Sequence, residues 1–268
     1  MTTADIGVFG GSGFYSLLDD VERVEVDTPY GPPADAVHVG MVGDRRVAFL
    51  PRHGADHRFP PHRVPFRANV WALRSVGVQR ILGPCATGSL KAGIAPGDFV
   101  VCDQLVDRTS GRTHTFFDGP TINHMSFADP YCPQLRSVAL EAGRAEGITV
   151  HDGGTVVVVE GPRFSTRAES GWYQAAGWDV INMTQYPEAA LARELGLCYA
   201  TVALVTDYDT GVEGVREQAV TMEEVFAVMG ANNEKVRRLL FRAIEAVPAD
   251  RACDCALGAG GLEPDPPA

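Results

Sequence analysis

Short runs of β-branched and apolar residues alternate along this chain with segments whose apolar residues recur at helical spacing. Strands are predicted at Ile6–Phe9, Val78–Leu82 and Thr155–Glu160, and helices at Phe66–Val76 and Pro133–Glu146. Buried parallel strands joined by crossover helices produce this alternation. The sequence therefore predicts an α/β fold, with helices on both faces of a sheet.

The other predicted elements continue the pattern. Further strands are predicted at Val37–Val42, Arg46–Leu50, Phe99–Leu105, Val180–Ile181 and Tyr199–Thr206, and further helices from Thr166 to about Ala176, from Pro187 to Leu195 and from Thr221 towards Val247. The two helices that begin at a threonine have a glutamate three residues later, as a capping box requires. No segment repeats at the period of a solenoid or propeller.

One domain accounts for the length of the chain. The 268 residues would allow two average domains, but α/β folds often place about 250 residues around one sheet. We therefore expect one domain over residues 1–250. Because its end is rich in glycine and proline, we expect residues 251–268 to form a mobile tail that carries Cys253 and Cys255 as free thiols.

The charge balance excludes some partners. The chain has 34 acidic and 23 lysine and arginine residues, a net charge of −11, and such a surface repels nucleic acids and anionic membranes. No apolar stretch approaches the roughly 20 residues that a membrane-spanning helix needs. We therefore expect a cytoplasmic protein that binds neither nucleic acid nor a membrane.

Two segments that follow predicted strands suit a phosphate. Ser12 lies in Gly10–Gly13, where backbone N–H groups and the serine hydroxyl could face an anion. A tight turn stays an alternative, while a dinucleotide fingerprint lacks its last glycine. Arg52 and His53 follow the predicted hairpin, and a guanidinium beside an imidazole also suits phosphate. A zinc site built from His53 and His57 is a weaker alternative without an H-E-x-x-H pattern.

Four later strand ends carry other candidate groups. Cys85 could be a nucleophile, but its surroundings differ from a nucleophile elbow and favour a backbone cradle. Phe164 could stack on a base or belong to the core, and Thr184 is a hydroxyl donor. Asp207 and Asp209 end an apolar strand, where burial would raise a carboxyl pKa and make a proton donor or a hydrogen-bond partner for a purine; a capping role is the alternative.

Taken in chain order, these segments resemble the methylthioadenosine phosphorylase branch of the purine nucleoside phosphorylase family. The resemblance covers about residues 5 to 245 and is carried by the motifs IGVFGGSGFY, DTPYG, PRHG, ATGSL, FADPYCP, EGPRFSTRAES, VINMTQYPEAALARE and TDYD. It implies a single α/β domain with a central mixed sheet in three α/β/α layers, assembled as a homotrimer with active sites near the subunit interfaces. It also implies reversible phosphorolysis of a nucleoside, with inorganic phosphate as co-substrate and with neither a metal nor an organic cofactor.

The resemblance assigns roles to residues of this chain. Phosphate would be bound by Ser12, Arg52, His53, Cys85, Ala86 and Thr184. Met183 would lie under the ribose, Phe164 and Ser165 would flank the base, and Asp207 and Asp209 would face its N7 and N6 atoms. The pocket for the 5′ group would contain Met222, Val225 and Phe226, together with His124 from a neighbouring subunit.

The implied reaction converts 5′-methylthioadenosine to adenine and 5-methylthioribose 1-phosphate. Asp207 would be the general acid if burial or Asp209 raises its pKa. One alternative keeps the phosphorolysis but acts on 6-oxopurine nucleosides such as methylthioinosine, inosine or guanosine. Alternatives from other classes are a thiol hydrolase that uses Cys85 and His53, and a nucleotide-binding module without catalysis.

Overall fold

The computed structural model describes residues 3–14 and 17–265 of the chain, and its centre is one mixed sheet. The strands are β1 (Ile6–Gly10), β2 (Glu22–Val24), β3 (Val37–Val42), β4 (Arg45–Pro51), β5 (Arg80–Ser89), β6 (Phe99–Val101), β7 (Gln104–Arg108), β8 (Val150–Asp152), β9 (Thr155–Val159), β10 (Val180–Asn182) and β11 (Cys198–Asp207). The main path through the sheet is β2-β3-β4-β1-β5-β10-β9-β7, and β11, β6 and β8 branch from β5.

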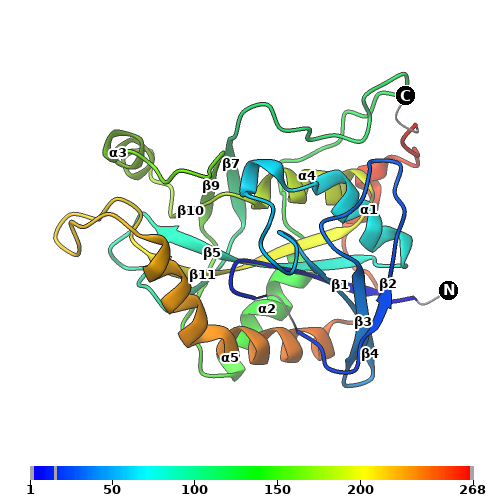
Figure 1. The fold of residues 1–268 in the computed structure, drawn as a ribbon, viewed down its shortest axis with the longest axis horizontal. Helices are drawn as coiled ribbons and strands as arrows, with labels where there is room; N and C mark the ends of the chain where they lie inside the picture. Colours follow the sequence, from blue (N-terminus) through cyan, green and yellow to red (C-terminus); the bar gives the residue numbers. More distant parts are fainter. Residues whose placement is uncertain (1–2, 15–16, 266–268) are drawn as a thin grey trace.

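Helices cover both faces of this sheet (Figure 1). They are α1 (Phe66–Ser75), α2 (Pro133–Ala145), α3 (Arg167–Ala175), α4 (Gln185–Glu194) and α5 (Met222–Ala246), with short 3-10 helices η1 (Pro61–Arg63) and η2 (Asp254–Ala259). The buried residues of α1 and α4 belong to one apolar core, and those of α2 and α5 belong to a second core. The predicted three-layer α/β/α fold with a central mixed sheet is confirmed.

Strand β5 pairs with three other strands of the sheet. It pairs in parallel with β11 along most of its length, with β1 only at residues 80–82, and antiparallel with β10 at residues 88–89. The sequence predicts this strand only as far as Leu82, because Gly83, Pro84 and Gly88 are typical of loops. The long pairing with β11 keeps the segment extended, and Gly83 is needed there because a Cβ atom would collide with the Tyr199 hydroxyl.

Other boundaries also differ from the prediction. The single strand predicted at Phe99–Leu105 is two strands, because the chain leaves β6 at Cys102 and joins a different neighbour as β7. The short strands β2 and β8 were not predicted. No helix in the described part of the chain is both long and apolar enough to cross a membrane.

The segment that the sequence predicts to be a mobile tail is packed against the domain over its described part. Cys255 is 2% exposed, and the Arg251 Nη2 atom donates to the Gly196 carbonyl at 2.6 Å. The side-chain amide of Asn123 donates to the Gly258 carbonyl at 3.1 Å. Buried apolar and hydrogen-bonded groups therefore hold this segment in place; residues 266–268 of the predicted tail lie outside the described residues.

Candidate active site

A cavity of about 370 Å³ lies where the neighbours of β5 change. Strand β1 pairs with β5 only as far as Leu82, and β10 joins the same edge at Gly88. Among the described residues no strand pairs with this edge between these two positions. Cys85, Ala86 and Thr87 come from this open stretch and line the cavity. Such switch points in α/β sheets are where ligands bind.

Most of the predicted site residues meet in this cavity. Its lining includes Ser12, Arg52, His53, Cys85, Ala86, Phe164, Ser165, Met183, Thr184, Asp207, Asp209, Met222 and Val225. It also includes residues that the sequence did not single out for this role: His57, Pro60, Pro61, Thr87, Gly88, Val159, Pro162, Ile181, Asn182 and Thr206. Groups from distant parts of the sequence therefore form one site.

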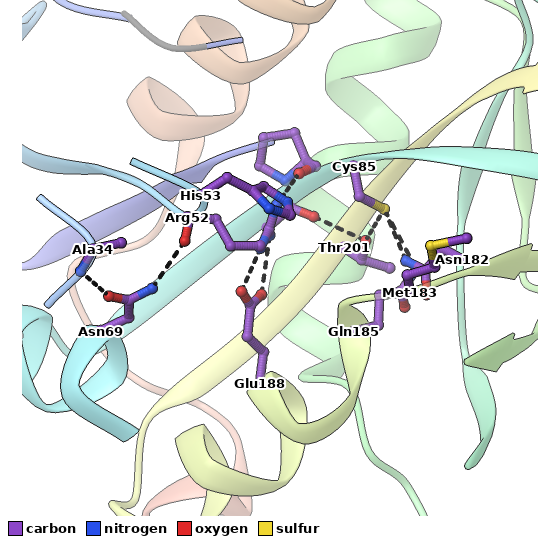
Figure 2. Close-up of polar contacts among 12 residues, drawn as sticks. Ala34, Arg52, His53, Asn69, Cys85, Asn182, Met183, Gln185, Glu188 and Thr201 are labelled. Atoms are coloured by element: carbon purple, nitrogen blue, oxygen red, sulfur yellow. Dashed lines mark hydrogen bonds and ion pairs between the residues drawn. The ribbon is translucent and has the colours of Figure 1, made fainter. Parts of the chain in front are cut away.

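Arg52 is fixed at one wall of the cavity by Glu188 of α4 (Figure 2). Its Nε and Nη2 atoms each donate to one carboxylate oxygen of Glu188, the second bond measuring 3.0 Å, and Nη1 donates to the Pro84 carbonyl at 3.1 Å. The Tyr199 hydroxyl donates to the same carboxylate at 2.9 Å. Burial opposes the charge on Arg52, but Glu188 raises the Arg52 pKa above its usual value. The guanidinium is therefore charged and held in one orientation.

The sequence did not point to Glu188. Its only signal is an acid next to the apolar residues of the predicted helix that begins at Pro187, and Glu194 is a second acid in the same helix. Glu188 is fully buried, and Arg52 is 1% exposed. A buried carboxylate of this kind needs a cationic partner, which here comes from the turn after β4, 136 residues away.

His53 is held in one tautomer and is uncharged at neutral pH. Its Nδ1 atom lies 2.8 Å from the Phe59 carbonyl oxygen. Because a carbonyl oxygen only accepts hydrogen bonds, Nδ1 carries the proton and Nε2 is left as an acceptor. Burial, and then the nearby charge of Arg52, lower the pKa of His53 to about 3. A hydrogen phosphate ion in the cavity could therefore donate its own hydroxyl to Nε2.

Buried polar atoms in the cavity wall lack partners within the protein. In the part of the chain that the structure describes, Thr87 Oγ1 and Asn182 Oδ1 have no hydrogen-bond partner. Ser165 Oγ and Asp209 Oδ2 also lack a partner of hydrogen-bond geometry. The Ser165 hydroxyl nevertheless lies near the Asp209 carboxyl group and lowers its pKa. Leaving buried polar groups unpaired costs about 1–3 kcal/mol each. Their concentration in one cavity indicates a polar ligand.

Asp207 lies at the far end of β11 with its carboxyl group 5% exposed. The Thr206 hydroxyl and the Asp209 backbone N–H each donate to it at 2.7 Å. Burial raises the pKa of Asp207 to about 6, although these two bonds oppose the shift. A Cβ atom at Gly88 would lie 2.8 Å from the Asp207 carboxylate, so glycine is needed beside it. Asp207 is therefore a buried acid that can be protonated near neutral pH.

Asp209 lies in the left-handed region, with a φ of 50°. Its carbonyl accepts from the Val220 N–H at 2.8 Å, and this bond fixes the turn after β11. Burial raises the pKa of Asp209 as well. Arg52 contacts the Pro84 carbonyl, whereas Asp207 pairs with Gly88, four residues further along β5. The two carboxyl groups and the charged guanidinium therefore lie at different ends of this stretch of the cavity wall.

Apolar groups complete the cavity. Phe164 lines it and also packs against the core that contains α2 and α5, and its stacking on a base stays a prediction. Met183 lines the cavity, and a Cβ atom at Gly161 would lie 2.6 Å from its sulfur. Met222 and Val225 line the wall formed by α5.

Two predicted residues do not line the cavity. Phe226 is 40% exposed and places its ring 6.2 Å from that of His57, at a steep angle, beside the cavity. His124 is exposed on the long loop before α2. The prediction for His124 requires a second subunit, which the structure of one chain does not test.

The alternative chemistries find little support in this geometry. The Cys85 sulfur contacts the side chains of Thr201, Asn182 and Gln185, and no hydrogen bond among the described residues joins it to His53. Nor does any third ligand among those residues join His53 and His57 in a metal site. A nucleophilic cysteine requires a base within hydrogen-bond reach. The hydrolase and histidine–zinc interpretations therefore lack their essential contacts.

Comparison with known proteins defines the class. The profile described as the phosphorylase superfamily matches residues 5–245, and the chain belongs to that superfamily. At 55% identity it is similar to a purine nucleoside phosphorylase of Streptomyces coelicolor, over 97% of this chain and 96% of that one. It is equally similar to an S-methyl-5′-thioadenosine phosphorylase of Mycolicibacterium smegmatis, over 96% and 97% of the two chains.

The fold gives the same assignment. A methylthioadenosine phosphorylase from Schistosoma mansoni, solved in complex with adenine, superposes with a TM-score of 0.88 at 38% identity and covers 93% of each chain. The family resemblance predicted from the motifs is therefore confirmed, and the protein is a phosphorylase-family enzyme.

Proposed function

We propose that the protein catalyses the phosphorolysis of 5′-methylthioadenosine to adenine and 5-methylthioribose 1-phosphate. The observation that carries the proposal is a single cavity with a fixed guanidinium at one end and a buried acid, Asp207, at the other. The similar enzymes that carry the name methylthioadenosine phosphorylase support it.

The two ends of the cavity fit the two charges of the reaction. As the bond between C1′ and N9 breaks, its electron pair leaves with the purine and positive charge develops on the ribose. A phosphate bound near Arg52 and Thr87 stabilises that cation and then bonds to C1′ through one of its oxygens. Protonated Asp207 donates its proton to N7, so the base leaves neutral. With a pKa of about 6, roughly a tenth of Asp207 is protonated at pH 7.

The remaining walls favour a 6-amino purine with an apolar 5′ group. An ionised Asp209 accepts hydrogen bonds, which suits an exocyclic amino group and repels a 6-oxo oxygen. Met222, Val225 and the Pro60–Pro61 pair offer apolar contacts to a methylthio group but no partner for a 5′-hydroxyl. 6-Oxopurine nucleosides are the alternative substrates, because one similar enzyme carries the broader name purine nucleoside phosphorylase.

The proposal also covers the oligomeric state and the cellular location of the enzyme. The enzyme acts as a homotrimer in the cytoplasm, with His124 of a second copy closing the 5′ end of the cavity. The exposure of Met222 and Phe226 beside the cavity leaves room for such a contact. The phosphorolysis uses inorganic phosphate as co-substrate and neither a metal nor an organic cofactor.

A substrate panel tests the function. Release of free base is measured from methylthioadenosine, methylthioinosine, adenosine and inosine, each with and without phosphate. The proposal predicts phosphate-dependent release of adenine, fastest from methylthioadenosine. Faster release of hypoxanthine would contradict the roles of Asp207 and Asp209, and base release without phosphate would contradict the phosphorylase assignment.

A further inference from the structure

Four cysteines from three separate parts of the chain meet on the side of the molecule away from the cavity. Cys132 is the N-cap of α2, Cys198 is the first residue of β11, and Cys253 and Cys255 lie at the start of η2. Their sulfur atoms all lie within 4.8 Å of one another. All four are free thiols, three of them are buried, and Cys253 is partly exposed.

The spacing of these sulfurs fits a tetrahedral metal ion. Zinc–sulfur bonds of about 2.3 Å in a tetrahedron place the sulfurs about 3.8 Å apart. The Cys198 and Cys253 sulfurs are 3.5 Å apart, and no other pair of the four exceeds 4.8 Å. Small side-chain rotations would therefore bring all four to bonding distance. A disulfide needs one pair at about 2.05 Å, whereas here each sulfur has the other three within 4.8 Å.

The position of Cys132 favours its thiolate, the form that binds metal. Cys132 lies at the N-terminus of a 13-residue helix, where the helix dipole stabilises negative charge. Four soft sulfur ligands without an oxygen ligand select zinc over magnesium or calcium.

We propose that Cys132, Cys198, Cys253 and Cys255 bind one structural Zn²⁺ ion. Each ligand binds as a thiolate, and its proton passes to solvent. Four protein ligands fill a tetrahedral site and leave no position for a substrate. Cys198 and Asp207 lie at opposite ends of the ten-residue strand β11, about 30 Å apart. The metal therefore takes no part in the phosphorolysis, and it lies where the sequence predicted two free thiols on a mobile tail.

The ion would fasten the end of the chain to the domain. The segment after α5 covers Arg80, which donates to the Ala249 carbonyl at 2.8 Å. The same segment bonds the loop before α2, through Asn123 to Gly258 and through the Thr121 N–H to Asp265 at 2.9 Å. This loop carries His124. Loss of the metal is therefore expected to loosen the chain end and this loop together.

The test begins with the unaltered protein, expressed with zinc and purified without chelator. Elemental analysis is expected to give about one zinc per chain. Exchange for Co²⁺ is expected to give the intense visible bands of a tetrahedral cobalt thiolate site. Cys253→Ser, which changes the most exposed ligand, should lose at least tenfold in zinc affinity. Cys102→Ser, which removes a buried thiol outside the cluster, should keep the full zinc content.

Two results would overturn the proposal. A denatured mass lower by two or four hydrogens, with no zinc, would show that the cluster forms disulfides instead. Six titratable thiols in protein that takes up neither zinc nor cobalt would show that it binds no metal. Both measurements use the unaltered chain, so they decide the question even if a cysteine variant fails to fold.

Discussion

The buried pair of Arg52 and Glu188 leads to a prediction that links stability to phosphate. In Glu188→Gln the shape is kept but the counter-charge is lost, so Arg52 stays buried with only neutral partners. Breaking a buried ion pair in this way costs about 3–5 kcal/mol. For a chain of this size each kcal/mol lowers the unfolding temperature by about 2–4 °C. At the lower cost of about 3 kcal/mol, we expect the unfolding temperature to decrease by about 6–12 °C in the absence of phosphate.

Phosphate is expected to reverse part of this loss. A phosphate ion in the same cavity brings negative charge to Arg52, so the variant gains more from it than the unaltered enzyme does. The assay is scanning calorimetry at constant ionic strength with phosphate from zero to saturation. Glu25→Gln is the matched control, because it breaks the exposed pair with Arg23 and should change the unfolding temperature little.

Two results would show that Glu188, Arg52 and phosphate are not linked in this way. Equal unfolding temperatures for the unaltered enzyme and Glu188→Gln in the absence of phosphate would show that Glu188 is not what compensates the buried charge. Equal stabilisation of both proteins by phosphate would show that the bound anion does not reach Arg52.

Three further changes test other parts of the site. Burial raises the Asp207 pKa to about 6, so kcat/KM should be high below pH 6 and fall about tenfold per pH unit above it. In Asp207→Asn, assayed at the same phosphate concentrations, this decrease of kcat/KM above pH 6 should vanish. If the decrease persists, another group causes it. Gly161→Ala places a Cβ atom against Met183 at a backbone φ of 66°, and should lower the free energy of unfolding, measured in urea, by about 2 kcal/mol. Because Met183 lines the cavity, the KM for the nucleoside should rise, and an unchanged KM would contradict the role of Met183. Thr221→Ala removes the cap of α5 and should cost about 1 kcal/mol of unfolding free energy in urea, whereas Thr221→Ser should not.

Local patterns predicted much of the fold and both ends of the site. The apolar strand that ends in Asp207 and Asp209, and the arginine and histidine after the hairpin, carry their signal in adjacent residues. Helical periodicity and two capping boxes likewise placed the helices within a few residues of their observed bounds. These features depend on residues that are close together in the sequence, so the sequence alone is enough to predict them.

The features that were not predicted depend on contacts between distant segments. Thr87 and Asn182 face the cavity only because β1 leaves β5 and β10 replaces it, which no local pattern records. Glu188 acquires its role from Arg52, which lies in a turn far away in the sequence. The sequence predicted Cys253 and Cys255 to lie on a mobile tail, because the cysteines that they meet, Cys132 and Cys198, are more than 50 residues away in the chain.

Identification of the sugar product shows whether the cavity brings phosphate to C1′ of a nucleoside. Phosphorus NMR of a complete reaction with methylthioadenosine should show inorganic phosphate consumed and a sugar 1-phosphate formed, in equal amounts with the released adenine. Release of adenine with free 5-methylthioribose and unchanged phosphate would show that water, and not phosphate, attacks C1′.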